Sequence, residues 1–586
     1  MQPKAAMALV AAAMAPGLVD AIWPAPAQMM TGDRVLFIGR DVKASYNGEP
    51  LPCAANGFHR QPGPRFRSRD VIAAGLSRAM AAILEHNFHP WKLRPRHADF
   101  EPDVRAKDKT YIESITIVQH GRDGPQAFRP RAGDVDESYA LDLSPDGQVR
   151  LECRNAVGCL WGLETFIQLF FQHSSGRDWY TPHAPVSIRD APKFPHRGVL
   201  MDVARMWYPV ADIKRTIDGM AWSKMNRLHL HATDSQSWPL EIPALPRLAE
   251  KGAYRRGLTY SPADLRGICE YAAERGVEVV LEIDMPGHTG VIELAYEDLI
   301  VAYNQKPYHW YCAEPPCGAF RMNSSKVYDF VDRLLDDLLP RLAPYSAYFH
   351  TGGDELNKND SALDPGVGSN DQAVIAPLLQ RFLDRVHARV RRAGMTPFVW
   401  EEMVTEWNQT LPNDVVVQSW LGNGAVQKLA RAGRKVIDSN FNFWYLDCGR
   451  GQWLNFDNGP AFQTYYPFND WCGPTKSWRL VYANDPTAGL SASAAKNVLG
   501  GEVAIWSELL DSTNLDSVLW PRASAAGEVL WSGRQDASGR NRSQYDAAPR
   551  LAEFRERMVA RGVSAMPVQM IFCTQGDATD CAMLTS

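Results

Sequence analysis

The chain has 586 residues, of which 45% are hydrophobic and 22% charged, and its formal net charge is −5. These proportions are typical of a soluble globular protein, and the near-balanced charge argues against a nucleic-acid-binding face or a strongly acidic tail. The length exceeds that of one ordinary hydrophobic core, so we expect two domains. Eighteen tryptophans are a high count, and tryptophan is typical of large apolar or ring-binding surfaces.

The first 21 residues have the pattern of a secretory signal. Lys4 precedes a stretch of small and apolar residues, and residues 19–21 have the small side chains wanted at a cleavage site. A frayed amino-terminal helix is the alternative. No later stretch has the roughly 18 uncharged apolar residues that span a bilayer. The sequence therefore predicts a secreted, extracellular protein that begins near Ile22 and has no membrane span.

Ten cysteines fit an oxidising compartment. Three pairs have spacings that could close loops: Cys312 with Cys317, Cys448 with Cys472, and Cys573 with Cys581. Cys159 and Cys269 lie in helix-like apolar patterns, so we expect buried thiols there. No spacing of cysteine and histidine indicates zinc, and we expect no metal and no organic cofactor. Four Asn-x-Ser/Thr sequons are candidate glycosylation sites: Asn323, Asn359, Asn408 and Asn541.

Residues 22–192 mix short strands with two helices. Strands are expected at 34–42 and 114–120, a hairpin at 138–153, and amphipathic helices at 70–88 and 155–171. This pattern predicts a small α+β domain. It contains no convergent set of reactive residues, so we expect a structural role for it.

Residues 193–586 alternate apolar, β-rich runs with helical patterns. The eight runs are 198–203, 227–232, 277–283, 347–350, 397–400, 415–420, 435–438 and 498–505. The helical patterns between them are 210–224, 262–275, 328–342, 372–393 and 425–432. Eight buried strands, most followed by a crossover helix, predict a (β/α)8 TIM barrel of the α/β class. An insertion at 444–496 separates the last two runs.

In such a barrel the active site is built at the carboxyl ends of the strands. Every predicted strand is followed there by charged or aromatic residues: Arg205, Asp234, Asp284, His288, Asp354, Glu355, Trp400, Glu401, Trp420, Tyr445, Asp447, Trp506 and Glu508. Any one of them could be a capping residue or a surface charge. Carboxylates surrounded by tryptophans favour a sugar site, because aromatic rings stack on the apolar faces of pyranoses.

The sharpest local signal is the hexapeptide His-Thr-Gly-Gly-Asp-Glu at residues 350–355. Its two glycines allow backbone angles that are closed to other residues. In a regular strand Asp354 and Glu355 would point to opposite faces, which does not suit the facing nucleophile and acid of an ordinary retaining glycosidase. One of the pair could instead contact the leaving oxygen and the other a 2-acetamido group. A polar turn at a strand end is the simpler alternative.

This hexapeptide resembles the signature of glycoside hydrolase family 20, the β-N-acetylhexosaminidases. Similar motifs occur at residues 196–205, 229–238, 282–288, 444–447 and 500–508. Residues 158–169 also resemble the amino-terminal domain of that family, and the style is closest to its fungal secreted members. Two residues depart from the family pattern: Leu230 stands where tryptophan is frequent, and Ser235 where many relatives have a second acid.

The resemblance implies substrate-assisted catalysis, in which the acetamido oxygen of the substrate attacks the anomeric carbon and forms an oxazolinium intermediate. By motif position, Glu355 is the general acid and then the base that activates water. Asp354 holds the acetamido N–H, and Tyr445 donates to the acetamido oxygen.

The remaining roles follow from the same resemblance. Trp400, Trp420 and Trp506 are expected to enclose the acetamido methyl group and the sugar face. Arg205, Asp447 and Glu508 are expected to bind ring hydroxyls, which penalises sugars that lack them. Asp234 and His288 are expected to form a pair that orients Glu355.

Two other functions remain open at this stage. One is a glycosidase acting on unsubstituted sugars through a covalent intermediate, with Glu401 or Glu508 as the nucleophile. The other is a carbohydrate-binding protein that has lost catalysis. The expected partner is in each case a carbohydrate, with no nucleic acid involved, and family members are often homodimers.

Overall fold

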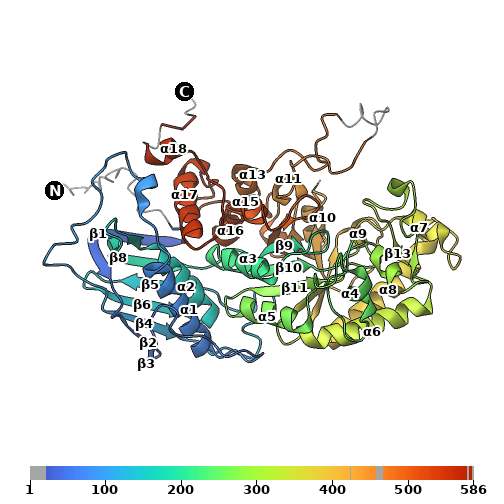
Figure 1. The fold of residues 1–586 in the computed structure, drawn as a ribbon, viewed down its shortest axis with the longest axis horizontal. Helices are drawn as coiled ribbons and strands as arrows, with labels where there is room; N and C mark the ends of the chain where they lie inside the picture. Colours follow the sequence, from blue (N-terminus) through green and yellow to red (C-terminus); the bar gives the residue numbers. More distant parts are fainter. Residues whose placement is uncertain (1–21, 423, 457–465, 577–579, 584–586) are drawn as a thin grey trace, which may run out of the picture.

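The computed structural model describes residues 22–422, 424–456, 466–576 and 580–583. The predicted signal segment, residues 1–21, lies outside the described residues. Figure 1 shows a sheet with its helices at one end of the molecule and a barrel at the other. Of the helices in the described ranges, none has both the length and the apolarity needed to cross a membrane.

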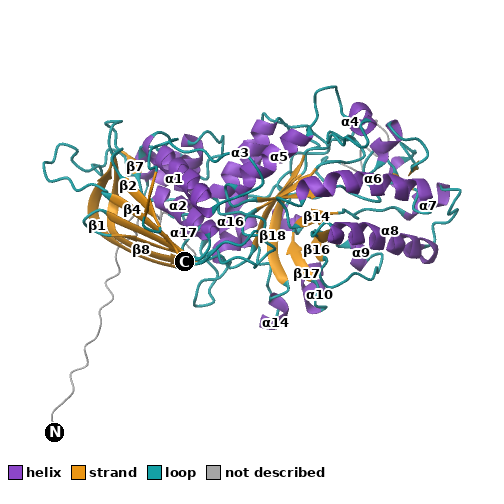
Figure 2. Cartoon of the chain, turned by 90° about the horizontal axis from the view of Figure 1, so that it is seen from below, coloured by secondary structure: helices purple, strands orange, loops and turns teal. Residues whose placement is uncertain are grey.

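The smaller part is an eight-stranded sheet with two helices on one face (Figure 2). Its main path runs in the order β1-β8-β5-β6-β4-β2-β3, and β7 pairs with β8. The strands are β1 (Gln28–Ile38), β2 (Lys43–Tyr46), β3 (Glu49–Leu51), β4 (Ser114–Gln119), β5 (Tyr139–Leu143), β6 (Gln148–Cys153), β7 (Phe171–Gln172) and β8 (Trp179–Asp190). The helices are α1 (Ser68–Leu84) and α2 (Ala156–Gln168).

Both predicted helices, the strand at 114–120 and the hairpin at 138–153 are therefore present. The strand predicted at 34–42 ends earlier, at Ile38, and starts earlier, at Gln28. The long strand β8 was not predicted. It lies between β1 and β5 and pairs with both, so its position depends on contacts distant in sequence.

The larger part is a closed barrel of eight parallel strands, which confirms the predicted fold class. The strands are β9 (His196–Asp202), β10 (Arg227–His231), β11 (Glu278–Glu282), β14 (Tyr348–His350), β15 (Thr396–Trp400), β16 (Val416–Ser419), β17 (Lys435–Asp438) and β18 (Val498–Ile505). Each overlaps one of the eight predicted runs.

Helices cover the outside of the barrel (Figure 2). The longer ones are α3 (Val210–Trp222), α5 (Pro262–Ala273), α6 (Ser325–Leu342), α8 (Gln372–Arg392), α10 (Ala425–Arg431), α16 (Arg522–Ser532) and α17 (Gln544–Ala560). The short elements are α4 (Arg247–Gly252), α7 (Lys358–Leu363), α9 (Glu402–Thr405), α11 (Phe441–Trp444), α13 (Trp478–Ala483), α14 (Ala492–Ala495), α15 (Leu515–Leu519), α18 (Ile571–Gln575), β12 (Ile300–Val301) and β13 (Ala319–Phe320). The loops of the described ranges also contain 3-10 turns at Pro90–Leu93, Gly290–Leu294 and Tyr308–Trp310.

Local sequence explains several helix boundaries. Helix α5 begins after Ser261, whose hydroxyl accepts from the Asp264 N–H while the Asp264 carboxylate accepts from the Ser261 N–H. This reciprocal cap, with Pro262 in the first turn, satisfies backbone donors that would otherwise lack partners. Helix α6 buries Val327, Val331 and Leu334, which have the spacing of one helix face. This apolar face is the side by which the helix packs on the rest of the protein.

Four disulfides are present. Cys312–Cys317, Cys448–Cys472 and Cys573–Cys581 confirm the three expected pairs, and Cys269 is a buried free thiol as expected. The expectation of a buried thiol at Cys159 is wrong, because Cys159 is bonded to Cys153. Strand β6 ends at Cys153 and α2 begins at Ala156, and this tight connection brings the two Cα atoms within 5.3 Å.

The interior of the barrel changes character along its axis. Near the amino-terminal ends of the strands it is apolar, with Val280, Tyr348, Phe398, Val416 and Ile437 in one cluster. Toward the carboxyl ends, buried histidines and carboxylates on β10, β11, β14 and β18 occupy it. A polar layer of this kind is stable only where its members satisfy one another.

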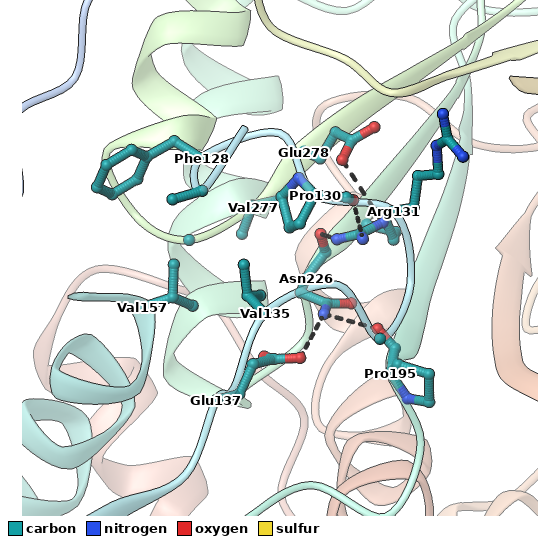
Figure 3. A pocket seen from close by; sticks show the side chains of 14 residues that line it. Phe128, Pro130, Arg131, Val135, Glu137, Val157, Pro195, Asn226, Val277 and Glu278 are labelled. Atoms are coloured by element: carbon teal, nitrogen blue, oxygen red, sulfur yellow. Dashed lines mark hydrogen bonds and ion pairs between the residues drawn. The ribbon is translucent and has the colours of Figure 1, made fainter. Parts of the chain in front are cut away.

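The two parts meet at the amino-terminal end of the barrel. Figure 3 shows a small pocket there, lined by Phe128 and Glu137 from the smaller part and by Asn226 and Glu278 from the barrel. The Asn226 amide donates to Glu137 Oε1 at 3.3 Å. Active sites of this fold lie at the opposite end, so this pocket belongs to the domain junction and not to the candidate site.

A buried ion pair ties the carboxyl-terminal helices to the start of the described chain. Arg550 on α17 donates to both oxygens of Glu528 on α16, each at 2.7 Å, and also to the carbonyl of Ile22 at 3.2 Å. The Glu528 side chain is fully buried. We predict that Arg550→Ala lowers the free energy of unfolding by about 3–5 kcal/mol, because an uncompensated carboxylate would remain inside.

The matched control is Arg385→Ala, which breaks a pair with Asp332 in which 45% of the arginine side chain is exposed. Its cost should stay below about 1 kcal/mol. Denaturant unfolding followed by fluorescence measures both variants. Equal losses would contradict the proposed importance of the Arg550–Glu528 pair.

Candidate active site

The signature hexapeptide leaves the barrel directly after strand β14. The strand ends at His350, so residues 351–355 form a loop and the alternation of strand faces does not apply to Asp354 and Glu355. Gly352 has φ 70°, and a β-carbon on it would lie 1.7 Å from Asp284 Oδ1. Only glycine fits this position. The Gly353 N–H donates to the same Asp284 oxygen at 2.9 Å and fixes the loop.

Asp354 and Glu355 face the same imidazole. His288 Nε2 lies 3.4 Å from Glu355 Oε2 and 3.9 Å from Asp354 Oδ2. Glu355 reaches this position with φ 51°, a left-handed conformation that costs a non-glycine residue about 1–3 kcal/mol. About 30% of its side chain is exposed, against 12% for Asp354. Glu355 can therefore meet a ligand from solvent, while Asp354 lies deeper.

The expected pairing of Asp234 with His288 is present in the structure. His288 Nδ1 lies 3.0 Å from Asp234 Oδ1, so the imidazole bridges Asp234 and Glu355. Burial opposes the charged imidazole, but the carboxylates of Asp234, Asp354 and Asp284 raise the pKa of His288 well above its ordinary value. The ring is thus held as an imidazolium between acids.

Asp354 lies close to two further buried carboxyl groups, those of Glu282 and Asp284. Oxygen atoms of Glu282, Asp284 and Asp354 lie within 4.8 Å of one another, and all three residues are buried. Burial, followed by the nearby charge of Asp354, raises the pKa of Asp284 well above its ordinary value. Burial also raises the pKa of Asp354. Two like charges so close cannot both ionise at low cost, and the stronger rise at Asp284 favours Asp284 as the member of the pair that holds a proton.

Aromatic rings form a wall beside this pair. Trp420 stacks on Tyr445 with ring centres 6.0 Å apart, and Trp506 lies 6.0 Å from Tyr445 and 6.3 Å from Trp400. The four residues come from the ends of four different strands, as the sequence predicted. Burial raises the pKa of Tyr445 well above its ordinary value, so its hydroxyl remains a donor.

Buried carboxylates hold two of these rings in place. Trp400 Nε1 donates to Glu282 Oε1 at 2.8 Å, and Trp420 Nε1 donates to Glu402 Oε1 at 2.8 Å. Burial and the Asp354 charge raise the pKa of Glu402 well above its ordinary value. Sequence reasoning missed Glu402, although it follows Glu401 directly, because nothing in the sequence indicates which of two adjacent acids points inward.

A cluster of charged groups around Arg205 adjoins the aromatic wall at Trp506. Its guanidinium lies 3.0 Å from Asp234 Oδ2 and 3.4 Å from Glu314 Oε1, and it covers the ring of Trp506 at 5.2 Å. Glu314 was not predicted. It lies in the loop closed by the Cys312–Cys317 disulfide and follows no barrel strand, so the strand-end rule could not find it.

Asp447 and Glu508 complete the ring of polar groups. The Trp506 N–H donates to Asp447 Oδ1 at 3.4 Å, and burial raises the pKa of Asp447 to about 7. Burial and then the charge of Glu314 raise the pKa of Glu508 well above its ordinary value. Cys448, next to Asp447, is held by its disulfide to Cys472. Both acids are thus kept ready to hydrogen-bond neutral hydroxyl groups.

Glu401, one candidate nucleophile for a covalent mechanism, has its carboxylate engaged elsewhere. Its Oε1 accepts from the backbone N–H groups of Trp420 and Leu421 at 2.8 and 2.7 Å, and from Ser419. The side chain is buried. Glu401 therefore caps the turn after β16.

Three of the four sequon asparagines, Asn323, Asn408 and Asn541, are exposed on the surface. Asn359 is half-buried, and its side-chain amide donates to the carbonyl of Trp310 at 2.9 Å. Exposure leaves room for a glycan at Asn408 and Asn541, whereas the Asn323 amide also donates to the carbonyl of Gly366 at 2.9 Å.

Comparison with known proteins identifies the family to which this site belongs. Residues 194–534 match the glycosyl hydrolase family 20 catalytic domain, and residues 22–169 match a domain described as beta-acetyl hexosaminidase like. A beta-hexosaminidase of the fungus Arthroderma benhamiae is 40% identical over 593 residues, which cover 95% of this chain and 96% of the relative. The chain belongs to glycosyl hydrolase family 20.

Proteins from organisms other than fungi are also similar to this chain, at lower sequence identity. A chitooligosaccharidolytic beta-N-acetylglucosaminidase of Ostrinia furnacalis is 33% identical, with 76% of this chain and 75% of the relative covered. Among solved structures, a Streptomyces plicatus N-acetyl-beta-hexosaminidase is 25% identical with a TM-score of 0.66, covering 94% of this chain and 98% of that one. A Flavobacterium johnsoniae chitobiase has a TM-score of 0.70 at 25% identity, covering 93% and 73%.

The protonated state of Asp284 can be tested by substitution. We predict that Asp284→Asn keeps at least about a tenth of wild-type kcat/KM, because an amide can accept from Gly353 and donate to Asp354 as the protonated acid does. Asp284→Leu, of similar size, should lose about 100-fold or more, since it leaves Asp354 without its donor. Equal losses in steady-state assays would mean that Asp284 acts as an anion.

Proposed function

We propose that this family 20 glycoside hydrolase is an exo-acting β-N-acetylhexosaminidase, which removes terminal non-reducing β-linked N-acetylglucosamine and N-acetylgalactosamine. The observation that carries the proposal is the placement of Asp354 and Glu355 on one imidazole, beside an aromatic wall. Two carboxylates on the same side suit an acid next to a group that holds the substrate's own nucleophile. They do not suit two carboxylates that face each other across the scissile bond.

In this mechanism Glu355 is the general acid. It gives its proton to the leaving oxygen as the bond to the anomeric carbon breaks, and it then takes a proton from water. Its exposed position and its contact with the His288 imidazolium support both steps. The imidazolium stabilises the carboxylate that remains after the first proton transfer.

Asp354 is the group that holds the acetamido N–H. In this role Asp354 is the anionic member of its pair with Asp284, and it stabilises the positive charge that develops on the oxazolinium ring. Tyr445 donates to the acetamido oxygen and aims it at the anomeric carbon. Trp400, Trp420 and Trp506 surround the methyl group.

The polar groups next to Trp506 bind sugar hydroxyls. Arg205, Asp447 and Glu508 are buried or half-buried and offer donors and acceptors that a deoxy sugar would leave unpaired. Relatives named for chitooligosaccharide cleavage support chitin-type oligosaccharides as one substrate class. No cofactor is needed for this chemistry, since the substrate supplies the nucleophile.

We also propose that the chain is secreted after removal of residues 1–21, glycosylated at exposed sequons, and assembled as a homodimer. The four disulfides support an oxidising compartment. Mass determination of the secreted protein, with and without glycan removal, measures the first two properties. Light scattering measures the third.

The function is tested with two nitrophenyl sugars and one variant. Wild type should cleave the β-N-acetylglucosaminide and leave the plain β-glucoside intact. Asp354→Asn should lower kcat on the acetamido sugar by about 100-fold or more, because its amide cannot offset positive charge in the transition state. Cleavage of both sugars would favour a protein nucleophile, for which Glu508 remains a candidate. A folded protein that binds sugar and cleaves neither would be a binding protein.

The role of Tyr445 gives a second test. Tyr445→Phe keeps the ring that stacks on Trp420 and removes only the hydroxyl donor. We predict a fall in kcat of about 100-fold with KM nearly unchanged, since the lost hydrogen bond acts in the transition state. A variant that raises KM and spares kcat would show that the hydroxyl only binds the ground state.

A further inference from the structure

The contact between Glu355, His288 and Asp234 continues far into the barrel. Beyond Asp234, acids and imidazoles alternate without interruption, and each is within hydrogen-bond distance of the next. We define this acid–imidazole chain as Glu355, His288, Asp234, His231, Glu282, His229, Glu502 and His196.

The inner half of the chain is closely spaced. His231 Nε2 lies 2.8 Å from Asp234 Oδ2, and its Nδ1 lies 2.5 Å from Glu282 Oε2. His229 Nε2 lies 3.0 Å from Glu282 Oε2, and its Nδ1 lies 3.1 Å from Glu502 Oε2. His231 and His229 thus each have an acid at both ring nitrogens. A carboxylate can only accept, so both nitrogens of each ring carry protons, and both rings are imidazolium ions.

The charges around these rings agree with this assignment. Burial alone opposes a charged ring, but Glu282 and Glu502 raise the pKa of His229 to about 9. Glu282 and Asp234 raise the pKa of His231 well above its ordinary value. Despite burial, the facing imidazoles hold the pKa of both Glu282 and Glu502 below the ordinary range.

Other groups also face the two rings. Arg205 Nη1 lies 3.5 Å from His231 Nε2, and the Trp506 ring meets His231 edge-on at 5.1 Å. The His350 ring stacks on His229 at 4.6 Å, and its Nδ1 lies 3.0 Å from Glu282 Oε1. Burial lowers the pKa of His350, so this third imidazole beside Glu282 is neutral.

The fold makes room for this chain. A β-carbon on Gly198 would lie 2.3 Å from Glu502 Cγ, so only glycine on β9 lets the Glu502 side chain lie inside the barrel. The Gln418 amide donates to Glu502 Oε2 at 2.9 Å and saturates that oxygen further. All six members from Asp234 to His196 are fully or almost fully buried. Removing so many charged groups from water is costly, and apolar residues fill this layer in most barrels of this type.

Glu282 connects this chain to both parts of the site. Its Oε2 contacts His231, which leads through Asp234 and His288 to the acid Glu355. Its Oε1 accepts from Trp400 Nε1, which belongs to the aromatic wall. One carboxylate thus orients the proton donor and the acetamido pocket together.

We infer that Glu282 and Glu502 are positioning residues, which keep the acid–imidazole chain charged and bridged and thereby fix the imidazole that faces Glu355. The inference rests on the proposed function for its kinetic consequence only. An anion beside an imidazole favours the charged ring. Loss of Glu282 therefore lowers the pH at which His231 gives up its second proton, and above that pH the neutral ring no longer offsets the charge of Asp234, which holds His288.

The test compares Glu282→Gln and Glu502→Gln with a matched control, Glu278→Gln. Glu278 is a buried carboxylate on the same strand as Glu282, but it accepts from Ser346 and the Ala347 N–H, outside the acid–imidazole chain. Glu282→Gln should lower kcat at least tenfold. It should also move the alkaline limb of the pH–kcat profile down by about one pH unit or more.

Glu502→Gln lies one imidazole further away and should move the same limb in the same direction by a smaller amount. Glu278→Gln should leave the profile in place, whatever it does to stability. Unchanged profiles in both chain variants, or an equal shift in the control, would overturn the inference.

A second measurement does not depend on turnover. In ¹⁵N-histidine-labelled protein, imidazole N–H groups bonded to buried carboxylates should give low-field proton signals that persist above pH 8. Glu282→Gln and Glu502→Gln should each remove some of these signals, while Glu278→Gln retains them all. If the signals behave in this way in a protein that cleaves no acetamido sugar, the proposed function fails and the charged chain stands. Absence of the signals from the wild type overturns the charged chain itself.

Discussion

The site depends on a carboxylate that is buried inside the barrel and has no access to water. Glu282 is fully buried, and its two oxygens meet imidazoles on β10 and β14 and the indole N–H of Trp400 on β15. A charge in this position is tolerable only when donors surround it at the right distance, as His231, His229 and the Trp400 indole do here. The positions of β10, β11, β14 and β15 relative to one another are thereby constrained, and the catalytic loop after β14 inherits that constraint.

The charge states of the acids at the carboxyl ends of the barrel strands depend on their buried neighbours. Asp234 receives contacts from two imidazoles and Arg205, and so joins His288 and Glu355 to the cluster around Arg205. Burial, followed by the charge of Asp354, raises the pKa of both Asp284 and Glu402 well above its ordinary value. The environment thus separates several acids of similar intrinsic strength into anions and proton donors, which is what a site with adjacent carboxylates requires.

Much of the fold and of the candidate site could be predicted from the sequence, for identifiable physical reasons. The eight barrel strands are buried on both faces, so each is a short apolar run, and each was found within a few residues. Glycines at 352 and 353 mark a loop that no other residue could form. The strand-end rule located Arg205, Asp234 and His288, because a parallel barrel brings all its carboxyl ends to one rim. Strand β8, the Cys153–Cys159 bridge and Glu314 were not predicted. Each is placed by a contact with a different element: β8 with β1, Cys153 on β6 with Cys159 on α2, and Glu314 with Arg205.

By itself, the sequence determined the fold class, the family and the identity of the residues at the carboxyl rim, because these rest on local periodicity and on residue types at fixed spacing. Only the tertiary structure decided which acids are charged. A carboxyl group's protonation depends on what lies within a few ångströms of it, and those neighbours come from strands distant in the chain. His229, His231 and Glu502 are ordinary members of their motifs when read in order. Closure of the barrel, in which β9 pairs with β18 on one side and with β10 on the other, turns them into one continuous acid–imidazole chain that ends at Glu355.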